Sequence, residues 1–316
     1  MTARKLLSLV MSGVFLVVIG CGQESESVPA NVPPPAPVAA GVLSFGSVSL
    51  GPAQEYGLFR PFASYVASQL GAVGIGKARV VVVDSLSQMV EELEAGRVDV
   101  YIDSPFPVGF VRQHADVVVS LRRWKWGSDS YRSVVFTRAD SGIATLDELS
   151  GNVIAFGEPF STSGFMMPKA SLASLGLTLV NYVDPAASIP ANQVGYVFSN
   201  DAENTIFWVL KGKVVAGAVN ADYYKPLAGS RIDELRVLHT TEPVPRNVVC
   251  FRSGLGSDVI RAVERVLLEM NLTDEGREIL ANFEGTTKFD RFPNGAEVDL
   301  AGIMELLPFV QEDLGQ

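Results

Sequence analysis

The chain has few of the side chains on which nucleophilic catalysis and metal binding usually depend. Its 316 residues include only two cysteines, Cys21 and Cys250, and two histidines, His114 and His239. These four residues lie far apart in the sequence and form no clustered Cys/His metal motif. The phosphate-binding loop of NTPases and the dinucleotide-binding glycine motif are also missing. The sequence therefore predicts no catalytic residue, no metal and no cofactor.

An excess of positive charge is missing too. The chain has 25 lysines and arginines against 35 aspartates and glutamates, so its formal net charge is −10. Non-specific nucleic-acid binding needs a basic face, and this composition argues against it. A small anionic ligand remains compatible with an acidic protein, because a few local donors are enough to hold one. With 47% apolar residues, the chain is long enough for two lobes and a sizeable core.

The apolar segment at the N-terminus is too short to span a bilayer comfortably. Arg4 and Lys5 precede fifteen apolar or small residues, Leu6 to Gly20, and Cys21 follows directly. The sequence "VIGC" resembles a bacterial lipoprotein signal, in which the cysteine is lipidated and becomes the mature N-terminus. The alternative is an ordinary secretory signal with an incidental cysteine. We expect residues 1–20 to be the signal peptide and Cys21 to carry the lipid.

A proline-rich segment follows this cysteine. Residues 21–41 contain five prolines and little apolar content, which is typical of a semi-extended tether of roughly 3 Å per residue. If Cys21 carries lipid, Cys250 has no partner for an intramolecular disulfide and is best interpreted as a small buried hydrophobe. The expected location is extracytoplasmic, with the protein anchored to a bacterial membrane by lipid.

From residue 42 onward, strand and helix patterns alternate, which indicates an α/β fold with mainly parallel sheets flanked by helices. Two extended stretches, around Arg138 and Val244, are suitable crossing points between lobes. They predict one lobe from residues 42–138 plus 245–316 and a second lobe from 139–244. Two crossover strands would then form a hinge, and the crevice between the lobes is the expected position of a ligand.

The most unusual passage is "GEPFSTSGFMMPK", in which three hydroxyl residues, Ser161, Thr162 and Ser163, precede Gly164. The surrounding sequence predicts a strand, a turn and then a helix that begins near residues 163–164. Free N–H groups at a helix N-terminus, neighbouring hydroxyls and a glycine that allows close approach together suit an oxyanion without any cation.

The same cluster has two alternative interpretations, a helix cap and a catalytic nucleophile. One serine could simply cap the helix, which needs a single hydroxyl. A catalytic nucleophile is less consistent with the sequence, because the G-x-S-x-G frame is absent around Ser161 and Ser163 and neither histidine lies nearby. The residues alone leave the cap and the anion site as open alternatives.

Four stretches in the same order resemble a known family. These are "LSFGSV", "GRVDVYIDSP", "SYRSVVFTRADSGIATLDELSGNVIAFGEPFSTSGFMMPK" and "VPRNVVCFR". The chain is similar, from about Leu43 to its C-terminus, to the phosphate/phosphite/phosphonate substrate-binding proteins of bacterial ABC importers. This resemblance implies a two-lobed periplasmic-binding-protein fold of type 2, with two crossover strands.

The resemblance also implies ligand-binding residues. The family's Ser-Thr-Ser grip on the phosphorus oxygens maps onto Ser161, Thr162 and Ser163, beside Gly164, and a family tyrosine maps onto Tyr131. Carboxylates that meet a ligand ammonium in aminophosphonate binders fall near Asp222 and Asn247, and the second of these is a neutral amide here. The first-lobe turn would contribute Asp103 and Ser104, where the family commonly has aromatic or small residues.

The function implied is that of a monomeric solute-binding lipoprotein, not an enzyme. It would bind a small phosphorus oxyanion and deliver it to an ABC permease in the cytoplasmic membrane. Two alternatives on the same fold are a sensor that presents its ligand to a membrane kinase and a binding protein for ferric iron or another anion. The adjacent Tyr223 and Tyr224 suggest the iron alternative. An enzyme on this fold is disfavoured, because no base is apparent.

Overall fold

The computed structural model describes residues 41–314. The predicted signal peptide, the lipidated Cys21 and the tether up to residue 40 lie outside the described residues. Within the described part of the chain, no helix combines the length and the apolar character that a membrane span requires.

The first of two six-stranded sheets has the strand order β14-β4-β13-β3-β1-β2. The pairs of β1 with β2 and β3 are parallel, and those of β13 with β3 and β4, and of β14 with β4, are antiparallel. The strands are β1 (Gly41–Val48), β2 (Ile75–Val83), β3 (Val100–Asp103), β4 (Val117–Lys125), β13 (Asn247–Arg252) and β14 (Thr286–Arg291).

Helices cover both faces of this sheet. Phe59 and Phe62 of α1 (Pro52–Ser68) pack with β1, α7 (Ser257–Glu269) and α8 (Asp274–Asn282) in one core. Met89 of α2 (Leu86–Glu94) and Val108 of α3 (Pro105–His114) belong to a separate core. The apolar residues of α1 and α2 recur at helical spacing and so lie on one face of each helix. Ser85 caps α2 by accepting a hydrogen bond from the Gln88 N–H.

The second sheet has the order β11-β6-β10-β7-β9-β8 and is likewise mixed, with parallel pairing among β8, β9, β7 and β10. Helices α5 (Ala202–Leu210) and α6 (Ala221–Ala228) pack in one core with this sheet, and α4 (Met167–Ser174) belongs to another. The strands are β6 (Ser133–Arg138), β7 (Val153–Phe156), β8 (Leu179–Asn181), β9 (Val194–Phe198), β10 (Ala216–Asn220) and β11 (Leu235–Thr240).

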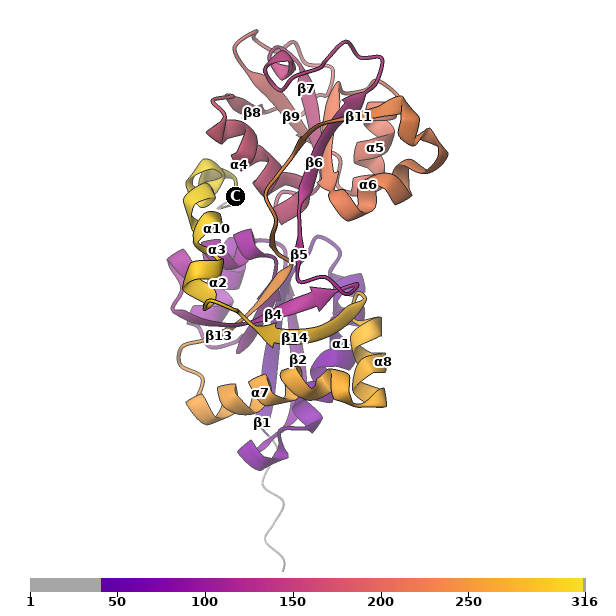
Figure 1. Cartoon of the computed structure of the whole chain (residues 1–316). Coiled ribbons are helices and arrows are strands. Elements are labelled where there is room, and N and C mark those ends of the chain that lie inside the picture. Colours follow the sequence, from indigo (N-terminus) through magenta and orange to yellow (C-terminus); the bar gives the residue numbers. More distant parts are fainter. Residues whose placement is uncertain (1–40, 315–316) are drawn as a thin grey trace, which may run out of the picture. The chain divides into compact units, whose positions relative to one another are not determined.

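Two short strands connect the sheets. β5 (Ser130–Tyr131) and β12 (Val244–Pro245) form an antiparallel pair of their own, in which Val244 lies opposite Tyr131 (Figure 1). The predicted α/β class, with two lobes joined by two crossover strands, is confirmed. The exact lobe boundaries stay a prediction, although β6 pairs with β10 and β11 of the second sheet rather than with the first.

Near the C-terminus, β14 adds a strand to the first sheet. Its burial does not alternate, because Thr286 and Phe289 are buried and the two residues between them are exposed or partly exposed, where the pairing with β4 is irregular. The sequence of this strand therefore lacks the period of two that marks a half-buried strand. After β14, α9 (Ala296–Asp299), α10 (Ala301–Leu306) and α11 (Gln311–Leu314) follow, and α10 contacts both α3 and α4 (Figure 1). Asp313 pairs there with Lys169 of α4.

Candidate functional site

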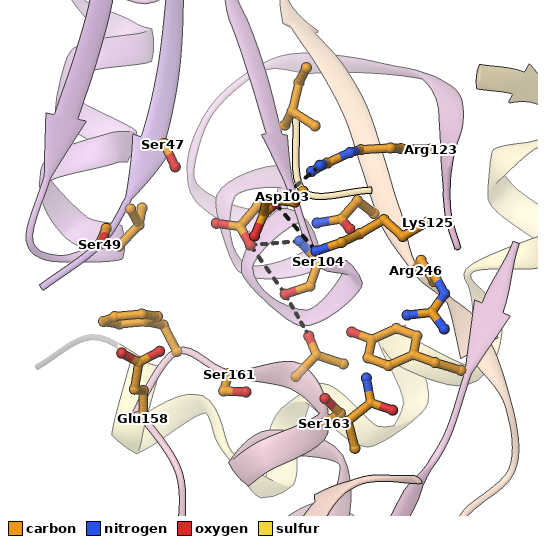
Figure 2. A pocket seen from close by; sticks show the side chains of 18 of the residues that line it. Ser47, Ser49, Asp103, Ser104, Arg123, Lys125, Glu158, Ser161, Ser163 and Arg246 are labelled. Carbon is orange, nitrogen blue, oxygen red and sulfur yellow. Dashed lines mark hydrogen bonds and ion pairs between the residues drawn. The ribbon is translucent and has the colours of Figure 1, made fainter. Parts of the chain in front are cut away.

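The site is a cavity of about 310 Å³ whose lining comes from both sheets and from the crossover strands. Figure 2 shows polar side chains pointing into it from several directions. Its polar lining residues are Ser47, Ser49, Glu55, Asp103, Ser104, Arg123, Lys125, Tyr131, Glu158, Ser161, Thr162, Ser163, Asn220, Tyr223, Arg246, Asn247 and Glu284.

The three-hydroxyl segment lies at the end of β7, where the chain turns into a helix. Residues Thr162–Met166 form one π-helical turn that continues directly into α4. Ser161 is the N-cap, and its hydroxyl oxygen accepts a hydrogen bond of 3.0 Å from the Gly164 N–H. The capping interpretation therefore holds for Ser161. The N–H groups of Thr162 and Ser163 precede any carbonyl partner within the helix, so they remain suited to an anion.

Gly164 is needed for this turn to fit. A Cβ at this position would lie 2.9 Å from the Ser161 hydroxyl oxygen, which is closer than real Cβ atoms approach. Glycine thus lets the segment close on itself and keeps Ser161 as the cap. The backbone N–H of Gly157 donates to the Gly164 carbonyl oxygen at 2.9 Å, which fixes the turn from the β7 side.

Thr162 links the two lobes directly. Its hydroxyl accepts a hydrogen bond from the Phe106 N–H at 3.3 Å and donates to the Ser104 hydroxyl oxygen at 2.9 Å. The Phe106 N–H lies in the first turn of α3, which belongs to the first lobe. The two lobes therefore contact each other at Thr162, and the Thr162 hydroxyl hydrogen is directed at Ser104.

Asp103 extends this chain of hydrogen bonds into the first lobe. Its carboxylate accepts from the Tyr101 hydroxyl at 2.7 Å and from the Ser104 N–H and hydroxyl at 2.6 and 3.1 Å. Burial nevertheless disfavours the charged form and raises the pKa of Asp103 to about 7, although the three donors counteract the shift. A carboxyl group with such a pKa changes its charge within the physiological range.

Two cations extend from β4 toward the cavity. Arg123 is almost fully buried, and its guanidinium donates to the Phe283 carbonyl oxygen and to the Glu284 carboxylate at 2.8 and 3.0 Å. The Lys125 ammonium shares the same carboxylate at 3.2 Å. One carboxylate thus serves two cations. Burial and then the neighbouring Arg123 lower the pKa of Lys125, which is the shift expected where positive charge is not fully compensated.

One glutamate from each lobe also lines the cavity. Glu55 of α1 accepts a hydrogen bond from the Ser47 hydroxyl at 2.6 Å, and Glu158 lies in the second-lobe turn before Ser161. Figure 2 shows Glu158 and Ser49 on one side of the cavity and Lys125 and Arg246 on the other. Burial raises the pKa of both glutamates, and the charges on Asp201 and then Glu55 add to the shift at Glu158.

Arg246 follows the crossover strand β12 and lies above two aromatic rings. Its guanidinium carbon is 5.1 Å from the ring centroid of Trp126 and 5.4 Å from that of Tyr131. The side chain is 5% exposed and pairs with Asp222 of the second lobe, whereas its buried Nε has no hydrogen-bond partner among the described residues. A buried donor without a partner is costly, so a ligand atom in this cavity would be favourable there.

Seven of the nine predicted ligand-binding residues line this one cavity: Asp103, Ser104, Tyr131, Ser161, Thr162, Ser163 and Asn247. Of the other two, Gly164 borders an adjoining cavity, and Asp222 is half exposed and engaged by Arg246. Burial raises the pKa of Tyr131, so its hydroxyl stays protonated and able to donate. Their roles in binding stay a prediction.

Sequence reasoning missed six charged residues of the cavity, which are Glu55, Arg123, Lys125, Glu158, Arg246 and Glu284. A signal existed for two of them, because Arg123 and Lys125 are two residues apart on a strand and therefore share a face. The glutamates lie on α1, in the turn before Ser161 and after α8, and no local pattern brings these segments together.

The adjacent tyrosines point into different surroundings. Tyr223 lines the cavity, whereas Tyr224 is 6% exposed and packs against Phe136 at a ring distance of 5.1 Å. The two hydroxyls thus do not converge on one metal. Among residues 41–314, no group of three or more His, Cys, Asp and Glu side chains is arranged to hold a metal ion.

Comparison with known proteins identifies the family of this chain. Residues 47–294 match the family model described as "ABC transporter, phosphonate, periplasmic substrate-binding protein". The solved structure of XAC2383 from Xanthomonas citri bound to chloride ion is 25% identical, covers 86% of this chain and 98% of its own, and superposes with a TM-score of 0.80.

Two further solved structures share the fold. PhnD1 from Prochlorococcus marinus in complex with methylphosphonate is 17% identical over 88% of this chain and 100% of its own, with a TM-score of 0.63. A binding protein component of an ABC phosphonate transporter from Pseudomonas aeruginosa is 17% identical over 87% and 88%, also with a TM-score of 0.63. The chain belongs to the family of periplasmic substrate-binding proteins of phosphonate ABC transporters.

Proposed function

We propose that this protein binds a small phosphorus oxyanion, such as a phosphonate, phosphite or phosphate, in the cavity between its lobes and delivers it to an ABC permease. Members of its family are extracytoplasmic solute-binding components of transporters and not enzymes. The proposal concerns the ligand, the residues that hold it and its delivery. Binding needs no chemical change in the ligand, so the cavity requires donors and charges but no base.

The observation that carries the proposal is the convergence of two kinds of anion-binding group on one cavity. The start of the helix at Ser161–Ser163 offers N–H groups and hydroxyls, and Lys125 and Arg246 offer positive charge from the first lobe and its crossover. Donors fixed at a helix N-terminus favour an anion, and cations facing the same space strengthen that preference. Closure of the lobes around the ligand would then create the form that the permease recognises.

The hydrogen bonds made by Ser161 and Thr162 lead us to expect different roles for their hydroxyl groups. Ser161 uses its oxygen as an acceptor from Gly164, so its O–H hydrogen remains available to a ligand. The Thr162 hydroxyl is committed to Ser104 and Phe106 and is better placed to hold the lobes together. Tyr131, Ser163 and Asn247 complete the expected donor set.

The two glutamates restrict the ligand further. Glu55 and Glu158 line the same cavity, and burial disfavours the charged form of both. A ligand that carries hydrogen-bond donors on the side away from the phosphorus group would relieve this cost. Asp222 and Asn247, to which the family resemblance assigned that task, are a salt-bridged carboxylate and a neutral amide here.

The test of this proposal is calorimetric titration of the full chain with phosphate, phosphite, methylphosphonate, aminoethylphosphonate, sulfate and ferric citrate. We expect saturable binding of at least one phosphorus oxyanion and weaker binding of sulfate and of ferric citrate. Binding of ferric citrate alone would favour the iron alternative, and absence of binding to every phosphorus compound would contradict the proposal.

We also propose that Cys21 carries the lipid anchor. The proposal rests on the position of the cysteine directly after the short apolar segment. Replacement of Cys21 by Ser should abolish the incorporation of labelled fatty acid into the expressed protein, while Cys250→Ser, the other cysteine, should leave labelling unchanged. Persistent labelling of the Cys21→Ser protein would contradict a lipid at this position.

A further inference from the structure

A tryptophan with an unusual backbone conformation lies at the cavity. Trp126 directly follows β4 and has φ = 51°, in the left-handed region that residues other than glycine seldom adopt. Its indole is 50% exposed although it is the largest kind of side chain. A strained residue at a binding cavity suggests a local function, because the surrounding structure must hold it in place.

The neighbouring loop is adapted to this conformation. The Trp126 N–H donates to the Gly285 carbonyl oxygen at 2.8 Å, and a Cβ added to Gly285 would lie only 2.2 Å from the indole Nε1. Gly285 itself has φ = 64°. The absence of a side chain at residue 285 is therefore what allows the indole to lie against the backbone. The orientation of the ring is set by the first lobe.

The second lobe meets this ring from the other side. Tyr223 of α6 makes an edge-to-face contact with Trp126, with ring centroids 5.7 Å apart and an interplanar angle of 67°. Both residues line the cavity, and Tyr223 is 37% exposed. The ion pair between Arg246 and Asp222 lies beside this contact, since Arg246 is also above the Trp126 ring. The two lobes thus touch here through aromatic rings as well as through Thr162.

We propose that Trp126 and Tyr223 form a gate that closes over the bound ligand and slows its release. The proposal rests on the proposed function, because it assumes that the cavity holds an oxyanion. An edge-to-face pair contributes a modest attraction beyond its buried area and exists only while the lobes are together. Loss of either ring should therefore raise the dissociation rate of the ligand more than it lowers the association rate.

The principal test is stopped-flow measurement of ligand dissociation from the full chain, with whichever of phosphate, phosphite and methylphosphonate binds in the titration. Trp126→Gly removes the ring and also relieves the backbone strain, so it should not lower the thermal stability. Trp126→Phe keeps an aromatic ring. We expect ligand dissociation to be about fivefold to tenfold faster from the Trp126→Gly and Tyr223→Ala proteins than from the unmodified chain. Dissociation from the Trp126→Phe protein should differ less than about twofold.

Tyr56→Ala is the matched control, because Tyr56 is an exposed tyrosine on α1 that does not line this cavity. It should leave the dissociation rate unchanged. If Trp126→Gly and Tyr223→Ala also leave it unchanged, or if Trp126→Phe is as fast as Trp126→Gly, the gate is contradicted.

A second test does not depend on the ligand and separates the gate from the proposed function. The full chain with Cys21→Ser, Trp126→Cys and Tyr223→Cys is treated with a short bifunctional thiol reagent, and Cys250 stays unreactive because it is fully buried. An intramolecular link is expected, and a Trp126→Cys, Tyr56→Cys pair should give none. Failure of residues 126 and 223 to link would contradict the gate even if an oxyanion binds. If residues 126 and 223 are linked but no oxyanion binds, the proposed function is contradicted, whereas the contact between the two lobes at these residues is supported.

Discussion

The first-lobe wall of the cavity carries most of its formal charge, whereas the second-lobe wall offers mainly hydroxyls, an amide and backbone N–H groups. The serine and threonine hydroxyls and the N–H groups of the second lobe belong to one short segment and the start of one helix, so their positions are set together by local geometry. The amide is that of Asn220, at the end of β10. The charged first-lobe groups come from five separate segments of the chain. They are Glu55, Asp103, Arg123, Lys125, Arg246 and Glu284.

This difference indicates a division of tasks between the two walls. Fixed donors at a helix start discriminate by direction, because hydrogen bonds weaken steeply when they are misaligned. Charges act over longer distances and depend on ionic strength. We therefore expect the second lobe to determine which oxyanion fits and the first lobe to determine how strongly its charge is stabilised after closure. Glu158 is the charged exception on the second-lobe wall.

The largest effect is expected from the second-lobe wall. The double substitution Ser161→Ala and Thr162→Ala removes a hydroxyl that can donate to the ligand and the hydroxyl that bridges the lobes. Hydrogen bonds to a charged group contribute about 1.5–3 kcal/mol each, so the dissociation constant should rise about 100-fold. Titration calorimetry measures this change. The site assignment fails if the oxyanion affinity of the double variant equals that of the unmodified chain.

A smaller effect should follow from removing first-lobe charge. Lys125→Met keeps most of the side-chain length and leaves Glu284 paired with Arg123 alone. Affinity should fall about tenfold at low ionic strength and by less at high salt, because screening weakens what the charge contributes. Lys77→Met on β2, at an exposed position, is the control. Equal losses at low and high salt would show that Lys125 does not act through its charge.

The smallest effect concerns Asp103 and appears as a pH dependence. Burial raises its pKa from 3.8 to about 7, so the folded protein binds a proton more tightly than the unfolded chain. The stability that this proton confers is present at low pH and is lost as the pH rises toward 7 and slightly above. Asp103→Asn removes the titration. The melting temperature of the unmodified chain, measured relative to the Asn variant, should fall between pH 5 and pH 8.

A control for this titration is Asp233→Asn, at an exposed position of the second lobe. Its melting temperature should follow that of the unmodified chain across the same pH range. If the melting temperature of the Asp103→Asn protein also changes with pH in parallel with that of the unmodified chain, the Asp103 carboxyl does not titrate between pH 5 and pH 8. It would then act in the cavity as a permanently charged hydrogen-bond acceptor.

The same contrast between the walls explains how much of the site the sequence predicted. The hydroxyl segment, Ser161 to Ser163, follows a buried strand and precedes a helix, so neighbouring residues in the sequence are enough to predict its surroundings. Arg123 and Lys125 alternate along a strand like many surface residues, and nothing local shows that Glu55 and Glu284 face them. To predict the first-lobe wall, one must know that β4 pairs with β13 and β14, which lie more than a hundred residues later in the chain. A single sequence does not determine this pairing.

The fold was predictable for a related reason. Apolar residues recur at helical spacing in α1 and α2, and continuous apolar runs occur in β2 and β13. β14 was missed because its six residues include four polar or charged side chains beyond its first threonine. The Asp222 carboxylate is paired with the buried Arg246, a contact that the sequence did not predict, and its role at the ligand stays a prediction.

The most direct test of the account is a titration of the full chain with methylphosphonate, repeated with the Ser161→Ala, Thr162→Ala protein. Saturable binding by the unmodified chain, together with an about 100-fold weaker response of the double variant, is the result that the account predicts. Binding of equal strength by both proteins would place the ligand elsewhere. Absence of binding of methylphosphonate, aminoethylphosphonate, phosphite and phosphate to the unmodified chain would contradict the proposed ligand class itself.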